Sequence, residues 1–314
     1  MNSSPCIPPL SVITGANNGF GLALAKLLLL KGHEVVFACR RVEAADKEIS
    51  QLDSSVTATG RAVAMKLDLA DLESVVAFVA EFEENYTNKG RHMSYLVLNA
   101  GVVKLQHDRT KQGFEETYGV NHFGGAALFN LLLERVLIPS RTRVVAVGSM
   151  IHSSAKHVNT HHDLTGNTNF STFNNYAASK LFNTLWALHA NKLYSGRGVT
   201  VTSGHPGSGL FTGLGRGDAS PLFKAAITPV LYLLAPLAWA VGHFQTWHDG
   251  GVAELAMCEC PEGGVYFDKH RRATPSQQAL DVQLQSWLWD RTQVLLLEVS
   301  SKYSLTADIS LANK

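Results

Sequence analysis

Residues 10–32 read LSVITGANNGFGLALAKLLLLKG, and this stretch decides the fold. A short β-rich run, 10–14, leads into a turn that holds Gly15, Gly19 and Gly21, and an apolar helical pattern follows. Glycines let the backbone approach a pyrophosphate, and a helix N-terminus presents free amides and the positive end of the helix dipole. The alternative is a turn that merely needs glycine. Three glycines in seven residues, spaced G-x-x-x-G-x-G at this junction, favour nucleotide binding.

The next predicted strand, 33–41, ends in Arg40 and Arg41. In a doubly wound fold, the adenosine ribose of a dinucleotide lies at the end of this strand, and many NAD-selective proteins keep an acidic residue there. Two cations instead favour a 2′-phosphate, so the sequence predicts NADP(H) in preference to NAD(H). The alternative is that both arginines are simply solvated.

Strand-like and helix-like segments alternate along the rest of the chain. Because no internal repeat or linker interrupts them, the pattern predicts one α/β domain spanning 1–314. This domain has a doubly wound, mainly parallel sheet of about seven strands, with helices on both faces. The further predicted strands are 62–67, 95–98, 143–148, 199–203 and 264–267, and the further predicted helices are 43–53, 70–86, 113–137 and a long helix after Asn175.

Polar and small residues follow several of these strands, at the edge of a parallel sheet where ligands bind. Asp68 can accept a hydrogen bond from an adenine amino group or cap the next helix. The Asn99-Ala100-Gly101 run can let backbone pass close to a cofactor, and Ser149 reaches the same edge. Asn121 is expected in the middle of a helix, where asparagine is unfavourable. It is therefore predicted to open the helix locally or to hold a water, unless it is a satisfied core amide.

Tyr176 and Lys180 lie four residues apart on the predicted long helix, so their side chains share one face. A cation beside a phenol favours the phenolate and lowers the phenol pKa. Such a tyrosine could exchange a proton with an alcohol or a carbonyl near neutral pH. A surface pair with the same spacing is the ordinary alternative.

The composition indicates a globular protein with a neutral or small-molecule partner. Of the 314 residues, 46% are hydrophobic, and 27 basic side chains balance 26 acidic ones, so no net field would recruit nucleic acid. The four scattered cysteines suit a reducing compartment. The histidines at 152–162 lie in a polar loop pattern, and no metal is predicted. With neither a signal peptide nor an N-terminal anchor apparent, we expect a cytoplasmic location or a peripheral one on an intracellular membrane.

Two segments near the end of the chain are expected to serve substrate binding and packing. Residues 208–250 are predicted to form a substrate-lid insertion, and the uncharged run 225–242 is long enough to span a membrane. Because two prolines interrupt this run, a lid or a shallow membrane-contacting surface is preferred, with an ordinary core helix pair as the alternative. Residues 276–299 are predicted to form an amphipathic helix that caps the domain or touches a partner, and the chain could form a homodimer.

Taken together, the motifs resemble the short-chain dehydrogenase/reductase family. They are TGANNGFG at 14–21, Asp68, NAG at 99–101, Asn121 in GVNHFG, Ser149, Tyr176 with Lys180, and Pro206-Gly207. The resemblance covers nearly two thirds of the chain, from Leu10 to about Gly209. The ACRR, GVNHFG and GHPG runs look most like the retinol-dehydrogenase-like branch, which includes the WW-domain-containing oxidoreductase. The resemblance implies a Rossmann-type domain.

The resemblance also implies roles for individual residues. Tyr176 would be the general acid or base, and Lys180 would hold the nicotinamide ribose and lower the Tyr176 pKa. Ser149 would bind the substrate oxygen, and Asn121 would position a water that links Lys180 to solvent. The implied cofactor-binding residues are Thr14, Gly15, Asn17, Asn18, Gly19, Phe20, Gly21, Arg40, Asp68, Leu69, Asn99, Ala100, Gly101, Tyr176, Lys180, Pro206 and Gly207. The interval between Ser149 and Tyr176 is longer than in many relatives, so an extra flap over 151–173 is expected beside the substrate mouth.

The predicted function is an NADP(H)-dependent oxidoreductase that interconverts an alcohol and a ketone or aldehyde on an apolar substrate, such as a retinoid, a steroid or another lipophilic carbonyl. One alternative is reduction of a conjugated carbon–carbon double bond, as in relatives of protochlorophyllide reductase. Another is a non-catalytic NADP-binding regulator or scaffold. The complete set Asn121, Ser149, Tyr176 and Lys180 argues against the scaffold, because a binding module needs no proton relay.

Overall fold

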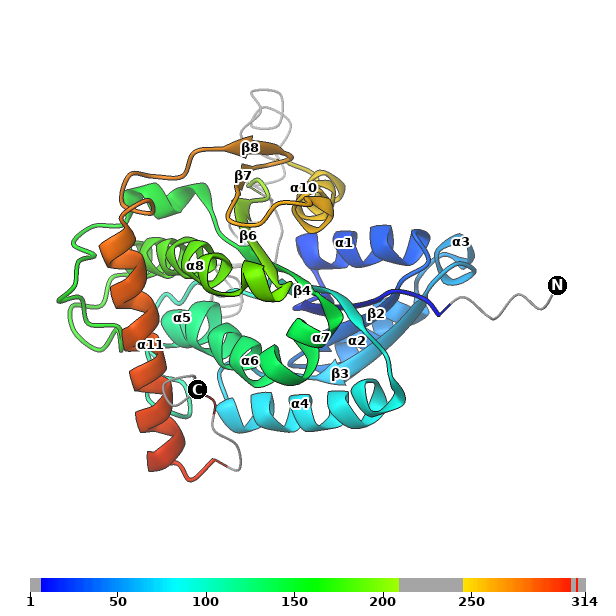
Figure 1. Ribbon diagram of the computed structural model, residues 1–314, viewed down its shortest axis with the longest axis horizontal. Coiled ribbons are helices and arrows are strands. Elements are labelled where there is room, and N and C mark those ends of the chain that lie inside the picture. The colour runs from blue at the N-terminus through cyan, green and yellow to red at the C-terminus, as the bar shows by residue number, and fades with distance from the viewer. Residues whose placement is uncertain (1–6, 209–244, 306–308, 310–314) are drawn as a thin grey trace, which may run out of the picture.

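The sheet of the computed structural model, which describes residues 7–208, 245–305 and 309, has the strand order β3-β2-β1-β4-β5-β6-β7-β8 (Figure 1). All neighbouring strands are parallel except β7 and β8. The strands are β1 Leu10–Thr14, β2 Glu34–Cys39, β3 Arg61–Lys66, β4 Met93–Leu98, β5 Arg143–Val147, β6 Thr200–His205, β7 Tyr266–Asp268 and β8 Arg271–Ala273. The predicted mainly parallel α/β fold is confirmed. The eighth strand was not predicted, because three exposed residues, RRA, carry no strand pattern.

Helices cover both faces of the sheet (Figure 1). One hydrophobic cluster joins the sheet to α1, α2, α3 and α10, and a second joins it to α4, α6, α8 and α11. In β5, Val144 and Ala146 belong to the second cluster, whereas Val145 and Val147 belong to the first, as the two-residue period of a strand requires. The helices are α1 Gly19–Leu30, α2 Val42–Ser50, α3 Ser54–Thr57, α4 Leu72–Asn85, α5 Glu116–Tyr118, α6 Gly124–Leu132, α7 Ile138–Ser140, α8 Thr172–Tyr194, α10 Trp247–Glu259 and α11 Val282–Lys302.

The strand order reverses between β1 and β4. The chain goes from β1 outward to β2 and β3, then returns to β4 on the other side of β1 and continues to β5 and β6. Connections that leave adjacent strands in opposite directions open a crevice at the carboxyl ends of those strands, which is where open α/β sheets bind ligands. The fold therefore places the binding site at the ends of β1 and β4.

The helical segment 116–140 is not regular. Two π-helical stretches, Gly119–Phe123 and Leu133–Leu137, separate α5, α6 and α7. Among the described residues this segment alone is long and apolar enough to cross a membrane, but 67% of its most apolar window is buried inside the protein. That burial is what a central helix packed against the sheet requires. Short 3₁₀ turns lie at Thr87–Lys89, Met150–Ser154 and Ser195–Arg197.

The helix predicted at 276–299 lies at Val282–Lys302, because Asp281 caps its first turn by accepting from Gln283 N and Leu284 N. This α11 packs on α8, where Trp289 stacks on Trp186 at 6.1 Å between ring centroids. The helix therefore caps the domain. Most of the predicted lid, together with the run 225–242, lies outside the described residues, and 247–250 already belong to α10.

Candidate active site

A cavity of about 590 Å³ lies at the carboxyl edge of the sheet and gathers nearly all of the predicted site residues. Asn121 and Gly21 are not among those that line it. The predicted residues that do are Thr14, Gly15, Asn17, Asn18, Gly19, Phe20, Arg40, Asp68, Leu69, Asn99, Ala100, Gly101, Ser149, Tyr176, Lys180, Pro206 and Gly207. Residues from the ends of β1, β2, β3, β4, β5 and β6 thus meet in one space.

The turn after β1 has the backbone geometry of a phosphate cradle. Gly15 and Gly19 have φ angles of 68° and 58°, a left-handed conformation that favours glycine. Asn18 caps α1, and its side chain accepts from Gly19 N. The first turn of α1, with its amides and dipole, opens on the cavity, so these residues fit the pyrophosphate of a dinucleotide.

Gly21 supports this turn indirectly. A Cβ on Gly21 would lie 2.4 Å from the Asn99 Nδ2, so only glycine leaves room for the Asn99 side chain. Asn99 Nδ2 donates to the Thr14 carbonyl at 2.7 Å, and Ala100 N donates to Thr14 Oγ1 at 3.0 Å. Asn99 therefore ties the ends of β1 and β4 together, and Gly21 is required by packing.

Positive charge collects where β2 ends. Arg40 and Arg41 both line the cavity. Lys66, at the end of β3, donates from Nζ to the Arg40 carbonyl at 2.5 Å. Two cationic side chains therefore line the position expected for the adenosine ribose, and Lys66 supports the backbone at Arg40. Lys66 was not predicted because its contact depends on the pairing of β2 with β3.

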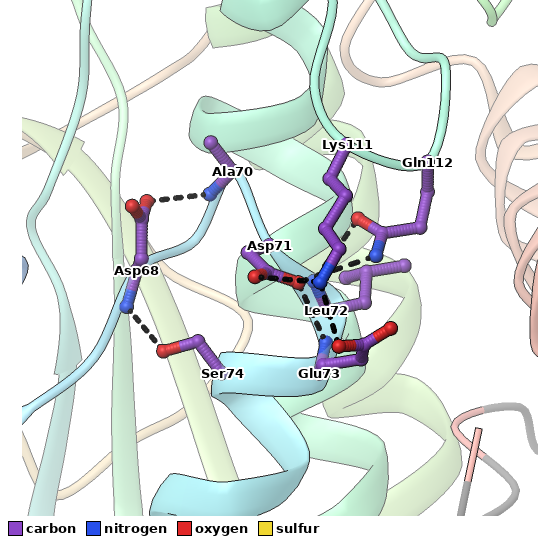
Figure 2. Close-up of polar contacts among 8 residues, drawn as sticks. All are labelled: Asp68, Ala70, Asp71, Leu72, Glu73, Ser74, Lys111 and Gln112. Atoms are coloured by element: carbon purple, nitrogen blue, oxygen red, sulfur yellow. Dashed lines mark hydrogen bonds and ion pairs between the residues drawn. The ribbon is translucent and has the colours of Figure 1, made fainter. Parts of the chain in front are cut away.

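Asp68 is held beside the cavity by the turn that leads into α4 (Figure 2). Its Oδ1 accepts from Ala70 N at 3.0 Å, and its backbone N donates to Ser74 Oγ at 3.0 Å. Asp71, not Asp68, caps α4 by accepting from Glu73 N. The capping role considered for Asp68 is therefore wrong, and its second carboxylate oxygen is left for another partner.

Lys111 and Gln112 fasten the loop before α5 to the same turn (Figure 2). Lys111 Nζ contacts Asp71 Oδ2 at 3.3 Å and Glu73 Oε2 at 2.6 Å. Gln112 is buried, accepts from Leu72 N at 3.1 Å and donates to Asp71 Oδ1 at 3.3 Å. These contacts fix the start of α4 and so the wall of the cavity at Asp68.

Tyr176 and Ser149 form the polar centre of the cavity. Ser149 lies two residues after the end of β5 in an extended conformation and caps the following 3₁₀ turn, accepting from Ile151 N at 3.3 Å. The side chains of Tyr176 and Ser149 both line the cavity. Burial raises the pKa of Tyr176 to about 12, and Ser149 acts in the opposite direction. The phenol is therefore protonated at neutral pH and has a proton to give.

Lys180 lies one turn further along α8 and is 3% exposed. Its Nζ donates to the Val147 carbonyl at 3.0 Å and lies 5.9 Å from the centroid of the Tyr176 ring. Burial lowers the pKa of Lys180 to about 8. The prediction that Lys180 lowers the Tyr176 pKa is not met, because burial and Ser149 are what shift that pKa and the Lys180 ammonium is directed at the sheet.

Asn121 stands behind the cavity in the first π-helical stretch, so the predicted local opening of the helix is confirmed. Its Oδ1 accepts from Val102 N at 2.7 Å, and its Nδ2 donates to the Val102 carbonyl at 3.0 Å and to Ser179 Oγ at 2.9 Å. A Cβ on Gly101 would lie 3.3 Å from both Asn121 Oδ1 and Lys180 Nζ. Gly101 thus lets Asn121 and Lys180 approach the same point.

Several lining residues were not predicted as site residues. Most are apolar, and their signal was only that they adjoin predicted ones. His205 is different, because burial lowers its pKa to about 4 and leaves the ring neutral at physiological pH. Of the flap predicted over 151–173, Ile151 alone lines the cavity. The lining residues without a predicted role are Ala38, Leu67, Val102, Val120, Val147, Gly148, Met150 and His205. Arg41 was predicted together with Arg40, and Ile151 and Ser208 belong to the predicted flap and lid segments.

One cavity is lined by the glycine turn at the N-terminus of α1 and by Ser149, Tyr176 and Lys180. This combination is typical of oxidoreductases that use a nicotinamide dinucleotide. The model of the short chain dehydrogenase family matches residues 10–217. The chain belongs to the short-chain dehydrogenase family and is an NAD(P)-dependent oxidoreductase that acts on alcohol or carbonyl groups.

The chain is also similar to individual proteins of this family. It is 37% identical to retinol dehydrogenase 12 from Homo sapiens over 290 residues, which is 91% of this chain and 85% of that protein. Its fold is similar to a short chain dehydrogenase from Burkholderia cenocepacia in complex with NADP, with a TM-score of 0.60, 22% identity and coverage of 83% and 95%. A 3-ketoacyl-(acyl-carrier-protein) reductase from Brucella melitensis complexed with NADH gives a TM-score of 0.59, 18% identity and coverage of 84% and 98%.

Proposed function

We propose that the protein interconverts an alcohol and a ketone or aldehyde on an apolar substrate, such as a retinoid or steroid, with NADP(H) as its cofactor. The observation that carries the proposal is the shared cavity, in which the Ser149–Tyr176 pair and Lys180 lie beside the glycine turn of α1. When bound, the cofactor would supply or accept the hydride. The residues of the chain would orient the partners and move the proton.

Tyr176 is the group best placed to exchange a proton with the substrate oxygen. In the reducing direction its protonated phenol would donate to the developing alkoxide, and Ser149 would hold the same oxygen by a hydrogen bond. In the oxidising direction the tyrosine would take the alcohol proton. Hydrogen-bond donors that are already in place cost little reorganisation during reaction.

Lys180 would replace the proton that Tyr176 gives up, and Asn121 would position a water for this relay. The Lys180 pKa of about 8 lies close to neutral pH, so the group can release and regain a proton in turn. Asn121 and Lys180 meet around Gly101, where they could hold a water that leads to solvent. Asn121 is fixed by its three hydrogen bonds, which suits a positioning role.

An apolar substrate is supported by the residues beside Ser149. Val102, Val120, Met150 and Ile151 line the cavity, and Met150 is 61% exposed, which is consistent with a place at the cavity mouth. Retinol dehydrogenases are among the similar proteins, and their names point to the same substrate class. A lid role for 208–250, membrane contact through 225–242, an intracellular location and a homodimer stay predictions.

Arg40 is expected to set the preference for NADPH over NADH. We expect Arg40→Asp to weaken NADPH binding by about 10- to 100-fold and to leave NADH binding nearly unchanged, because a charge-assisted contact with a 2′-phosphate is lost. Fluorescence titration of both cofactors measures the effect. Lys47→Asp on α2 makes the same change in charge away from the cavity lining and should change neither affinity. Equal affinities for NADPH and NADH in the parent protein would contradict the proposed preference.

The proposed function is tested with purified protein, NADPH and a panel of retinoid, steroid and aliphatic carbonyls, with separation of the products. Alcohol formation from an apolar member supports the proposal. A product that keeps its carbonyl and has lost a carbon–carbon double bond would favour the first alternative. Tight cofactor binding with no turnover across the panel would favour the regulator or scaffold.

A further inference from the structure

Glu254 is a buried carboxyl group outside the proposed catalytic residues. It lies on α10, its exposed fraction is 0%, and neither carboxylate oxygen has a hydrogen-bond partner among the described residues. Buried polar groups in proteins are nearly always paired, because an unpaired one costs free energy. A native group of this kind calls for an explanation beyond packing.

Glu254 faces the sheet beneath the cavity. It precedes Met257 by three residues, so both lie on one face of α10. A Cβ on Gly204, in β6, would lie 2.7 Å from the Met257 Cε, which places this face of α10 against the sheet. Gly148 N donates to the Gly204 carbonyl at 2.8 Å. Two neighbouring glycines leave the sheet without side chains at this point, so the layers on its two faces come close together.

Lys180 reaches the same end of the sheet from the opposite face. It projects from α8, and its Nζ donates to the carbonyl of Val147, the residue before Gly148. The two charges act on each other across the sheet. The ammonium lowers the pKa of Glu254 against burial, which raises it to about 8. The carboxylate raises the pKa of Lys180 against burial, which lowers it to about 8.

Other titratable groups lie around α10. Glu259 pairs with Lys31 on α1 at 2.8 Å. Burial, together with the charges of Glu254 and Glu259, holds the pKa of the Cys258 thiol well above its ordinary value, and Arg143 on β5 acts in the opposite direction. His205 on β6 is neutral because burial lowers its pKa to about 4. Because Cys258 stays a neutral thiol, Lys180 is the charged group that shifts the pKa of the Glu254 carboxyl.

We propose that Glu254 is a positioning residue of the proton relay, a buried counter-charge that acts across the sheet to keep Lys180 protonated. The inference rests on the proposed roles of Tyr176 and Lys180. As the pH rises and Glu254 loses its own proton, the new negative charge holds the proton on Lys180 to a higher pH than burial alone would allow. Lys180 can then reprotonate Tyr176 over a wider pH range.

The test is the titration of Lys180 in the resting protein. In protein labelled with ¹³Cε-lysine, the Lys180 resonance is assigned by its loss in Lys180→Met, and its chemical shift is followed with pH. We expect Glu254→Gln to move the Lys180 midpoint to lower pH by about one unit, as the loss of a nearby buried charge predicts. The alkaline limb of the kcat profile should move with it. Glu259→Gln removes a half-exposed carboxylate from the same helix and should move neither.

Glu254→Met gives an independent arm, because methionine has a similar volume and no polar group. Replacing an unpaired buried carboxyl by an apolar side chain should raise Tm while producing the same shift in the Lys180 midpoint. A role in packing alone would lower Tm and leave that midpoint in place. An unchanged Lys180 midpoint in both variants would overturn the proposal. The titration needs no turnover, so this result is separate from any failure of the proposed catalytic function.

Discussion

Tyr176→Phe is expected to lower kcat by about 10²- to 10⁴-fold while NADPH still binds. The change removes one oxygen atom, the one that would give its proton to the substrate. The phenol shares the cavity with Ser149 and, with a pKa of about 12, carries its proton at neutral pH. Steady-state rates with the best carbonyl of the panel and a fluorescence titration of NADPH measure the two effects.

Tyr194→Phe is the matched control. Tyr194 lies at the far end of the same helix, about 27 Å from Tyr176 along its axis, and packs against Phe129 and Trp289. This variant should keep the parent rate. Full turnover in Tyr176→Phe would remove Tyr176 from the chemistry. Loss of NADPH binding in that variant would indicate instead that the hydroxyl holds the cofactor or the cavity.

Lys180→Met is expected to lower kcat by about 10²-fold and also to raise the KM for NADPH, because the proposed relay and a charged hydrogen bond to the ribose are both lost. The parent enzyme should lose activity in the reducing direction as the pH rises through about 8, the pKa of Lys180, since the ammonium is the proton-donating form. Lys180→Met should not show this loss of activity at alkaline pH. Rates measured across the pH range test both statements.

The control for Lys180→Met is a measurement of its thermal stability, Tm. The Val147 carbonyl keeps a second donor, Asn183 Nδ2 at 3.2 Å, and the cost of burying a cation disappears. Tm should therefore stay the same or rise. A variant that keeps the alkaline limb of the parent would show that another group sets it, and a large fall in Tm would show that Lys180 acts through packing.

The carboxyl edge of the sheet could be predicted from sequence because each piece of it has a local signal. A strand followed by Gly15 and Gly19 predicts a phosphate-binding turn, and a single parallel sheet then brings Asn99, Ser149 and Pro206 to the same edge. Tyr176 and Lys180 share a helix face by spacing alone. These parts of the prediction depend on backbone periodicity, which sequence reports well.

Burial and side-chain pairing between residues that are far apart in the sequence have no such local signal. The pKa of Lys180 depends on its burial and on the charge of Glu254, which comes from α10. Asp71, which caps α4 in place of Asp68, is held by Lys111 and Gln112 from a distant loop (Figure 2). Which carboxyl caps a helix and which is buried is decided by packing between elements, and the sequence does not state that packing.

The central claim is that hydride passes between NADP(H) and a carbonyl carbon while Tyr176 supplies the proton. The most direct measurement uses NADPH deuterated at the transferable C4 position, an apolar aldehyde or ketone, and mass spectrometry of the product. We expect an alcohol with one deuterium on its carbinol carbon in the parent protein, and almost none of it with Tyr176→Phe. Deuterium on a former double-bond carbon with the carbonyl retained, or bound cofactor that never transfers its label, would contradict this mechanism.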